Sequence, residues 1–185
     1  MHPTLSHCGV LAFDPIAPRD VSVVLEHARA LQLAAEAGGL RTLLRGRKLG
    51  LLCEVDTDAR TNADTTADTD IGTDIEGDAA LFRRAALELG AHVARIRPSL
   101  NGLSTPREVQ HTASMLGRLY DAVECQGMAA ALVHQMGVDA GVPVYDGVAS
   151  NRHPTARLVD LLDGDASTLD KRRFVLQAVL LSTIA

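Results

Sequence analysis

Acidic side chains crowd residues 54–78, where Arg60 is the only base. Carboxylate oxygens are the hard ligands that divalent cations prefer, so this stretch has the donors for a cation site. It lacks the ligand spacing and the turn glycine of an EF-hand, and its other residues are almost all Thr, Ala and Gly, which cannot bury a core. We therefore expect a solvated, disordered insertion over residues 55–78 and no metal site. The alternative cation ligands are Asp64, Asp68, Asp70 and Asp74.

The thiols and imidazoles show no spacing typical of a reactive or metal-binding site. Cys53 and Cys125 lie within apolar runs that resemble strands, so we expect both to be inert core residues. The three cysteines form no CxxC motif, which argues against a disulfide framework or a structural zinc site and indicates a reducing, cytoplasmic compartment. No cofactor is expected. The histidines without metal-ligand spacing are His27, His92, His111 and His134.

The composition limits the classes of protein to which the chain can belong. Its 185 residues suit one domain, and a net charge of −5 argues against nucleic-acid binding, because phosphate contacts need surplus Lys and Arg. Aromatic residues make up only 3% and Trp is absent, so Leu, Val, Ala and Ile must build the core. No apolar run approaches the ~18 residues of a membrane helix, and the first residues lack a signal-peptide pattern, so we expect no membrane segment.

Helical and strand-like segments alternate with short connections, which is typical of a parallel sheet with helices on both faces. The fold class that we predict is a single α/β domain over residues 1–185. It is a three-layer sandwich with a four-stranded parallel sheet, closed by an amphipathic C-terminal helix over 169–184. Ligands of such folds bind at the carboxyl ends of the strands. The periodicity predicts strands near residues 50, 93, 123 and 144 and further helices over 20–37, 79–89, 106–119, 128–140 and 153–162.

Three motifs follow one another over about residues 79–163. They are Phe82-x-x-Ala85-Ala86-x-x-Leu89-Gly90-Ala91-His92-Val93, Thr112-Ala113-x-x-Leu116-Gly117-Arg118-x-Tyr120-Asp121-Ala122, and Val142-Pro143-Val144-Tyr145-Asp146-Gly147 followed by His153-Pro154-Thr155. In this order and spacing they resemble the helix-to-strand passages and the HPTQ segment of the aspartate and ornithine carbamoyltransferases. The resemblance implies a carbamoyl-phosphate-binding domain.

The resemblance also implies that a second domain is absent. In that family the HPTQ helix leads into an amino-acid-binding domain, and a last helix then returns to the first domain. Here Leu162 is followed by a short linker and then by residues 171–180, which resemble the returning helix. We expect Lys171-Arg172-Arg173 to be its solvated start. The family forms trimers through the domain that remains, which implies a homo-trimer with contacts from apolar residues such as Leu51, Leu52, Met115 and Leu119.

By resemblance, His153, Pro154 and Thr155 are the ligand-binding residues that the chain retains. The family holds phosphate with a Ser-Thr-Arg-Thr-Arg segment at a helix N-terminus. That segment aligns either with residues 57–61, where only Arg60 remains, or with residues 75–79, which hold no arginine. Both alternatives put a carboxylate near the phosphate, which like charge disfavours.

Other positions of the implied site have also changed. Gln126 stands where the family has an arginine, and Ala156 replaces the glutamine of HPTQ. We assign no catalytic residue. For His153 a simpler interpretation also stands, in which His-Pro begins a helix and contacts no ligand.

Two functions are consistent with these observations. The first is a carbamoyltransferase-like protein that is catalytically inactive alone and has a structural or regulatory role, through association with an active transcarbamylase. The second is a binder or enzyme that uses the retained cleft for carbamoyl phosphate or another small ligand. If the chain is active, the resemblance implies a carbamoyltransferase.

Overall fold

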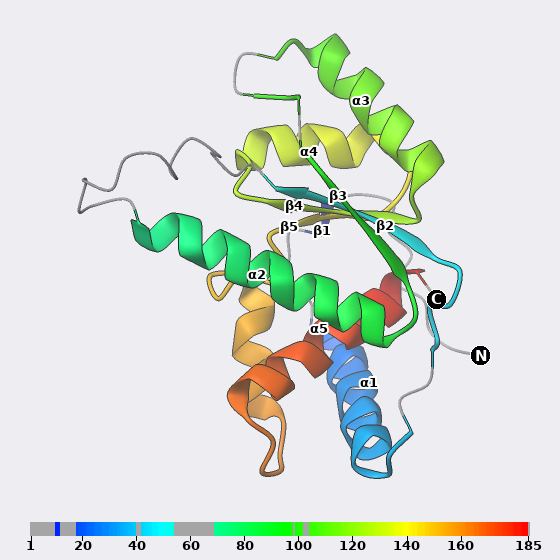
Figure 1. The fold of residues 1–185 in the computed structure, drawn as a ribbon, viewed down its shortest axis with the longest axis vertical. Helices are drawn as coiled ribbons and strands as arrows, with labels where there is room; N and C mark the ends of the chain where they lie inside the picture. Colours follow the sequence, from blue (N-terminus) through cyan, green and yellow to red (C-terminus); the bar gives the residue numbers. More distant parts are fainter. Residues whose placement is uncertain are drawn as a thin grey trace.

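In the part of the chain that the structure describes, five parallel strands form one sheet in the spatial order β1-β5-β4-β2-β3 (Figure 1). The computed structural model describes residues 10–11, 18–39, 42–53, 69–97, 99–101 and 104–184. The strands are β1 (Val10–Leu11), β2 (Lys48–Cys53), β3 (His92–Ile96), β4 (Ala122–Gln126) and β5 (Val144–Asp146). The helices are α1 (Pro18–Glu36), α2 (Thr69–Glu88), α3 (Pro106–Leu119), α4 (Ala130–Asp139), the 3-10 helix η2 (Pro154–Leu161) and α5 (Thr168–Ile184).

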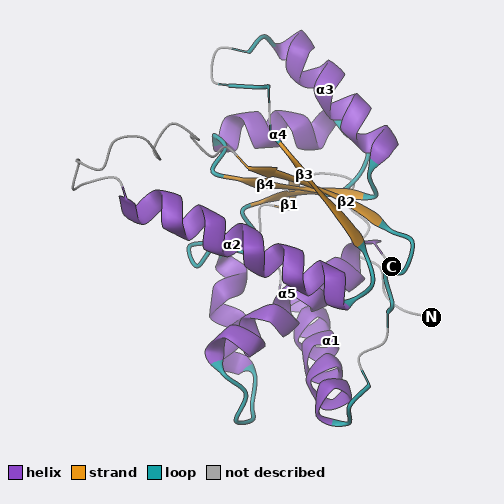
Figure 2. Cartoon of the chain, viewed as in Figure 1, coloured by secondary structure: helices purple, strands orange, loops and turns teal. Residues whose placement is uncertain are grey.

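This architecture confirms the predicted α/β sandwich with its parallel sheet and C-terminal helix. Helices α3 and α4 cover one face of the sheet, and α1, α2 and α5 cover the other (Figure 2). All four predicted strands are present. The additional strand β1 has only two residues, which pair with Val144 and Tyr145 of β5, and so short a strand leaves no periodic signal in the sequence.

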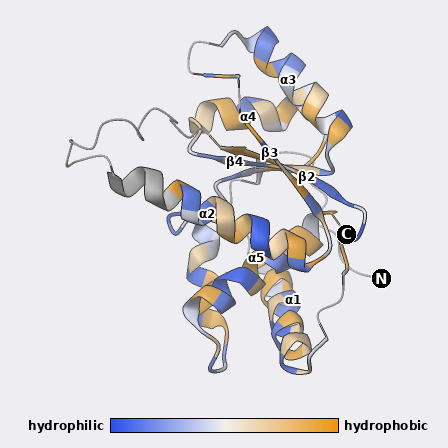
Figure 3. Cartoon of the chain, in the orientation of Figure 1, coloured by the Kyte–Doolittle hydropathy of each residue, from blue (hydrophilic) through white to orange (hydrophobic). Residues whose placement is uncertain are grey.

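The strand β2 separates two hydrophobic clusters. Leu49, Leu51 and Cys53 pack into the cluster formed with α1, α2 and α5, whereas Leu52 packs with α3 and α4. Because successive side chains of a strand point to opposite faces, a continuous apolar run serves both clusters at once. On the second face, α4 is largely apolar while α3 alternates between apolar and polar side chains (Figure 3). The buried run therefore suits β2 to its interior position between β4 and β3.

The last helix, α5, is buried on most of its sides rather than on one. Every residue from Arg172 to Leu180 is buried, and the helix packs against α1, α2 and η2. The expectation of an amphipathic helix with a solvated basic start is thus wrong. Arg172 and Arg173 are only 4% and 8% exposed, because α1, α2 and η2 surround this helix. Within the described ranges, no helix combines the length and the apolar character that crossing a bilayer would need.

Helix α2 begins at Thr69, ten residues before the predicted start at Ala79. Residues 69–78 were expected within the disordered acidic insertion and are helical instead, while residues 54–68 lie outside the described residues. Ile75, Ala79 and Phe82 recur at helical spacing, and Ala79 and Phe82 are buried in the core. Packing of this stripe extends the helix into a sequence whose Asp, Thr and Gly content disfavours helix.

Candidate functional site

Polar side chains converge on the carboxyl ends of β4 and β5, where the fold class predicts a ligand. His153 lies in the segment after β5 and caps η2, because its Nδ1 atom accepts a 3.3 Å hydrogen bond from the backbone N–H of Thr155. Nδ1 also lies 2.8 Å from the hydroxyl oxygen of Thr155. Both side chains are buried, and Pro154 occupies the first turn of η2. The structure thus brings the three retained residues together at one helix start, and their role in ligand binding stays a prediction.

Arg172 holds this helix start from α5. Its Nη1 atom donates a 3.0 Å hydrogen bond to the hydroxyl of Thr155, and its Nη2 atom donates to the carbonyl oxygens of Val148 and Ser150 at 2.7 and 2.9 Å. Burial lowers the pKa of Arg172 to about 10, against the opposing charges of Asp78 and Glu124. The guanidinium is therefore a buried cation bound mainly to neutral oxygens. The motifs in the sequence do not point to Arg172.

Glu124 is the most deeply buried acid of the site. Its side chain lies on β4, is fully buried, and accepts a 2.5 Å hydrogen bond from Nε2 of Gln126. Burial raises the pKa of Glu124 well above 4.5, and the charges of Asp146 and Asp78 raise it further, while backbone N–H groups of Ala149 and Val148 oppose the shift. A carboxyl in this position is neutral where an ordinary glutamate is charged. The side-chain amide of Gln126 is held by its hydrogen bond to Glu124.

Asp146 ends β5 beside the same cluster, and burial raises its pKa as well. The two cysteines near these strand ends are free and buried, as expected of core residues. Burial raises the thiol pKa of both Cys53 and Cys125, which keeps them protonated and poorly nucleophilic. Within the described ranges, no group of three or more His, Cys, Asp or Glu side chains is arranged to hold a metal ion. Asp64 and Asp68 lie outside those ranges.

Of the two candidate positions for a phosphate-binding segment, one lies outside the described residues and the other lies within α2. Arg60 and residues 57–61 lie outside the described residues. Residues 75–79 lie in the interior of α2, where backbone N–H groups donate to carbonyls four residues earlier and no free helix end is formed. Glu76 there is engaged by Arg95, which donates at 2.9 and 2.7 Å to its two carboxylate oxygens. Ala79 is buried against the core.

Comparison with known proteins gives a consistent family. The chain is 32% identical over 144 residues to an ornithine carbamoyltransferase of Actinobacillus pleuropneumoniae serotype 5b, covering 78% of this chain and 38% of that protein. It is 32% identical over 146 residues to the catabolic ornithine carbamoyltransferase of Chromobacterium violaceum, again covering 78% and 38%. The chain thus spans about two-fifths of the length of these curated relatives. No protein-family model matches it.

Solved structures show the same fold. The ornithine carbamoyltransferase from Pyrococcus furiosus superposes with a TM-score of 0.58 at 20% identity, over 79% of this chain and 41% of that one. The enzyme from Thermus thermophilus gives a TM-score of 0.57 at 19% identity, over 82% and 46%. Sequence and fold point to the same enzymes that the three motifs resemble. The chain therefore contains a domain of the aspartate/ornithine carbamoyltransferase family.

Proposed function

We propose that this chain is a carbamoyltransferase-like domain that transfers no carbamoyl group by itself and acts through assembly, in a structural or regulatory role. One observation carries the proposal, namely the continuity of α2 through residues 75–79. A phosphate bound at a helix N-terminus needs N–H groups that are not used within the helix. In α2 the backbone N–H groups of residues 75–79 already donate to carbonyls of the same helix.

The side chains of the same segment support the proposal. The two arginine positions of the family's phosphate-binding segment fall on Gly77 and Ala79 in this alignment. Gly77 has no side chain to offer, and Ala79 is buried, so that a guanidinium there would enter the hydrophobic core. Glu76 and Asp78 add negative charge where a dianion would sit, and like charges at contact distance repel.

The side chains of Gln126 and Glu124 on β4 also disfavour a bound phosphate. Gln126 replaces an arginine and donates to Glu124, so neither side chain presents a positive charge to an anion. Arg172 is the nearby buried cation, but its guanidinium is already committed to Val148, Ser150 and Thr155. Among these described residues, none offers the uncommitted, paired guanidiniums that bind phosphate strongly.

The junction between η2 and α5 supports the absence of an amino-acid-binding domain at this point. Arg29 and Gln32 of α1 donate hydrogen bonds of 3.1 Å to the carbonyl oxygens of Leu161 and Asp163. Lys171 donates from Nζ to the carbonyl oxygen of Leu162 at 2.8 Å. The short connection is thus held on both sides by this domain's own helices, which favours a direct passage from η2 to α5.

Assembly as a cytoplasmic homo-trimer, or with an active transcarbamylase, remains part of the proposal. Of the apolar residues expected at a trimer contact, Leu51 and Leu52 are core residues, so they are wrong as interface candidates. Met115 and Leu119 are 48% and 56% exposed and lie one turn apart on α3. The trimer proposal therefore rests on the exposed side of α3.

The decisive experiment assays the purified chain for product from carbamoyl phosphate with ornithine and, separately, with aspartate. An active ornithine carbamoyltransferase serves as positive control in the same buffers. We expect no product from this chain, and carbamoyl-phosphate-dependent product would refute the proposal. Light scattering at two salt concentrations tests the trimer, and a mass near 19.6 kDa at both would exclude it. Co-purification with an active transcarbamylase tests hetero-association.

A second candidate function is favoured by a group of acids on β4, β5 and α2. The charges of Asp146 and Asp78 act on Glu124, and such a group would suit a neutral or cationic small ligand better than phosphate. A thermal-shift screen with carbamoyl phosphate, phosphate, Ca²⁺, Mg²⁺ and polyamines tests this function. A ligand at 100 times its Kd adds about 2.7 kcal/mol to the unfolding free energy. No shift with any of these compounds would count against the second function.

A further inference from the structure

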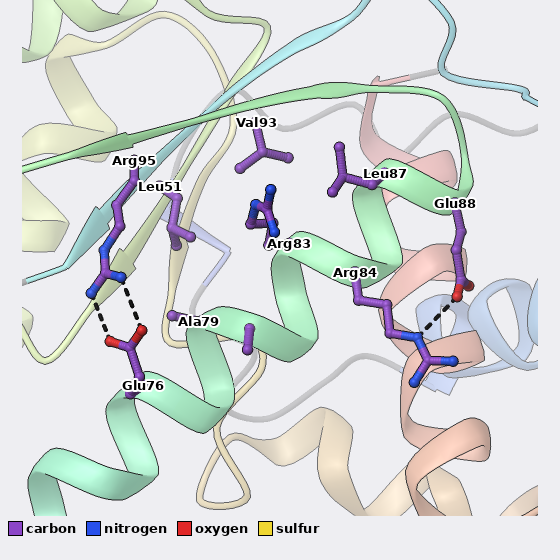
Figure 4. Close-up of a pocket in the computed structure, with 10 residues that line it drawn as sticks. Leu51, Glu76, Ala79, Arg83, Arg84, Leu87, Glu88, Val93 and Arg95 are labelled. Carbon is purple, nitrogen blue, oxygen red and sulfur yellow. Dashed lines mark hydrogen bonds and ion pairs between the residues drawn. The ribbon is translucent and has the colours of Figure 1, made fainter.

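A groove of about 440 Å³ lies between α2 and β3, the strand at the edge of the sheet (Figure 4). Its volume falls in the range of about 300–1,000 Å³ that is typical of small-molecule sites. None of the residues His153, Pro154, Thr155 and Arg172 lines it, so the groove is separate from the side chains that meet at the start of η2.

The middle of the groove is apolar. Leu51 of β2 and Val93 of β3 contribute from the sheet, and Ala79, Ala80 and Leu87 contribute from α2. Leu87 is 43% exposed, so its side chain is accessible to a ligand in the groove. An apolar ligand body in this position would remove Leu87 and Val93 from water.

Both carboxylates at the groove are already engaged by arginines. Glu76 accepts two hydrogen bonds from Arg95, at 2.9 and 2.7 Å. Glu88 lies 3.1 Å from Nε of Arg84 and 2.9 Å from Nε of Arg173, and it accepts a further bond from Gln177. These contacts fix the two ion pairs at opposite ends of the groove, as Figure 4 shows for Arg95–Glu76 and Arg84–Glu88.

Arg83 is the arginine of the groove lining that is not paired with Glu76 or Glu88. In the view of Figure 4 its side chain lies between the two ion pairs, toward Val93. It makes no hydrogen bond or ion pair with any residue in the described ranges. The lining arginines are Arg83, Arg84 and Arg95, against Glu76 and Glu88, so 3 − 2 leaves one positive charge at the groove. One positive charge beside an apolar surface matches a ligand that carries one negative charge and an aliphatic body.

We propose that this groove is a second binding site, specific for small aliphatic monocarboxylates. The carboxylate is held by Arg83, whose planar guanidinium offers two parallel N–H donors to it. The aliphatic body lies along Val93 and Leu87. The groove shares Glu76 and Ala79 with the segment of α2 on which the proposed function rests. Its test measures ligand binding and not carbamoyl transfer, so the two proposals can fail separately.

The test is an NMR titration of the ¹⁵N-labelled full chain with sodium hexanoate, butanoate and acetate, and with hexylammonium chloride as the charge-reversed control. We expect saturable amide shifts confined to α2 and β3. Affinity should rise about fourfold for each methylene that becomes buried, and hexylammonium should not saturate. No saturable shift with hexanoate, or equal binding of hexanoate and hexylammonium, would overturn the proposal.

Two variants and a matched control identify the residues responsible. R83Q removes the charge from an exposed position and should weaken hexanoate binding about tenfold or more, because charge-assisted bonds are the strong ones. L87S should weaken hexanoate more than acetate. R107Q changes an exposed arginine on α3, far from the lining residues, and should bind as the unmodified chain does. Unchanged hexanoate affinity in R83Q, or an equal loss in R107Q, would also overturn the proposal.

Discussion

The Nη1 atom of Arg172 donates a 3.0 Å hydrogen bond to the hydroxyl oxygen of Thr155, which joins α5 to the start of η2. The same guanidinium binds the carbonyl oxygens of Val148 and Ser150. One side chain of the last helix thus donates to three oxygens near the turn after β5. The carbonyl oxygen of Val148 also accepts from the hydroxyl of Thr155, and that of Ser150 also accepts from the backbone N–H of His153. Arg172 therefore adds a charge-assisted bond to each carbonyl.

Replacing Arg172 by Gln should therefore destabilise the domain strongly. The shorter amide cannot reach all three oxygens, and each lost hydrogen bond to a charged group is worth about 1.5–3 kcal/mol. We expect a loss of about 3 kcal/mol or more in unfolding free energy, measured by urea unfolding followed by circular dichroism. R107Q, at an exposed arginine, is the control and should change stability by less than about 0.5 kcal/mol. A loss in R172Q no larger than in R107Q would contradict this assignment.

Two glycines should respond to Ala substitution with opposite signs. A Cβ atom on Gly117 of α3 would lie 1.8 Å from the backbone carbonyl oxygen of Ala140, so α3 and the end of α4 must separate. We expect G117A to lose about 1–3 kcal/mol. Gly77 lies inside α2 with nothing within 4 Å of an added Cβ, so G77A should gain up to about 1 kcal/mol from helix propensity. Thermal unfolding of both variants checks the signs, and a stabilised G117A would disprove the close packing.

The buried carboxyl of Glu124 should make stability fall as pH rises. Its folded-state pKa lies well above 4.5, chiefly through burial, so the folded protein retains a proton that the unfolded chain releases. Between those two pKa values the unfolding free energy falls by about 1.4 kcal/mol per pH unit. E124Q removes this titration, and its stability relative to the unmodified chain should increase from about pH 4.5 upward.

Urea unfolding at several pH values between 4.5 and 8 measures the difference. E26Q, at an exposed glutamate on α1, serves as the matched control. Parallel pH profiles for E124Q and the unmodified chain would show that Glu124 is ionised in the folded protein.

A substitution at Gly164 tests how closely the connection between η2 and α5 packs against α1. Gly164 has a φ of +96°, and an added Cβ would lie 2.4 Å from Nε2 of Gln32. We expect G164A to cost about 1 kcal/mol from backbone strain, and to lose the bond from Gln32 to the carbonyl of Asp163. The double variant Q32A/G164A should retain the strain but not the clash. Wild-type stability in G164A would mean that the junction relaxes freely.

The sequence predicts this fold well where local signals and packing agree. Thr105, Pro106 and Glu108 are an example, since the helix predicted from residue 106 begins at a capping box in which Thr105 accepts from the backbone of Glu108. The start of α2 was not predictable in the same way. Its first turns have poor helix formers, and the helix is specified by where Ala79 and Phe82 pack, which only the tertiary structure shows.

The site was predicted only in part for a related reason. The motif located His153, Pro154 and Thr155 correctly at one helix start. Arg172 was missed because three consecutive basic residues usually mark a solvated helix end. Its spacing to Leu176 and Val179, both buried, was the available signal. Glu124 was missed because a single acid within an apolar strand gives no sign of whether its neighbours neutralise it.

The burial of α5 on nearly all sides bears on how the chain folds during synthesis. Its apolar residues complete a cluster begun by α1 and α2, elements that leave the ribosome long before it. Until α5 emerges, Leu31 of α1 and Phe82 of α2 have no partner on that side and stay open to water and to other chains. Until α5 has been made, this apolar surface favours aggregation or binding by chaperones, and slow translation before α5 would lengthen that exposure.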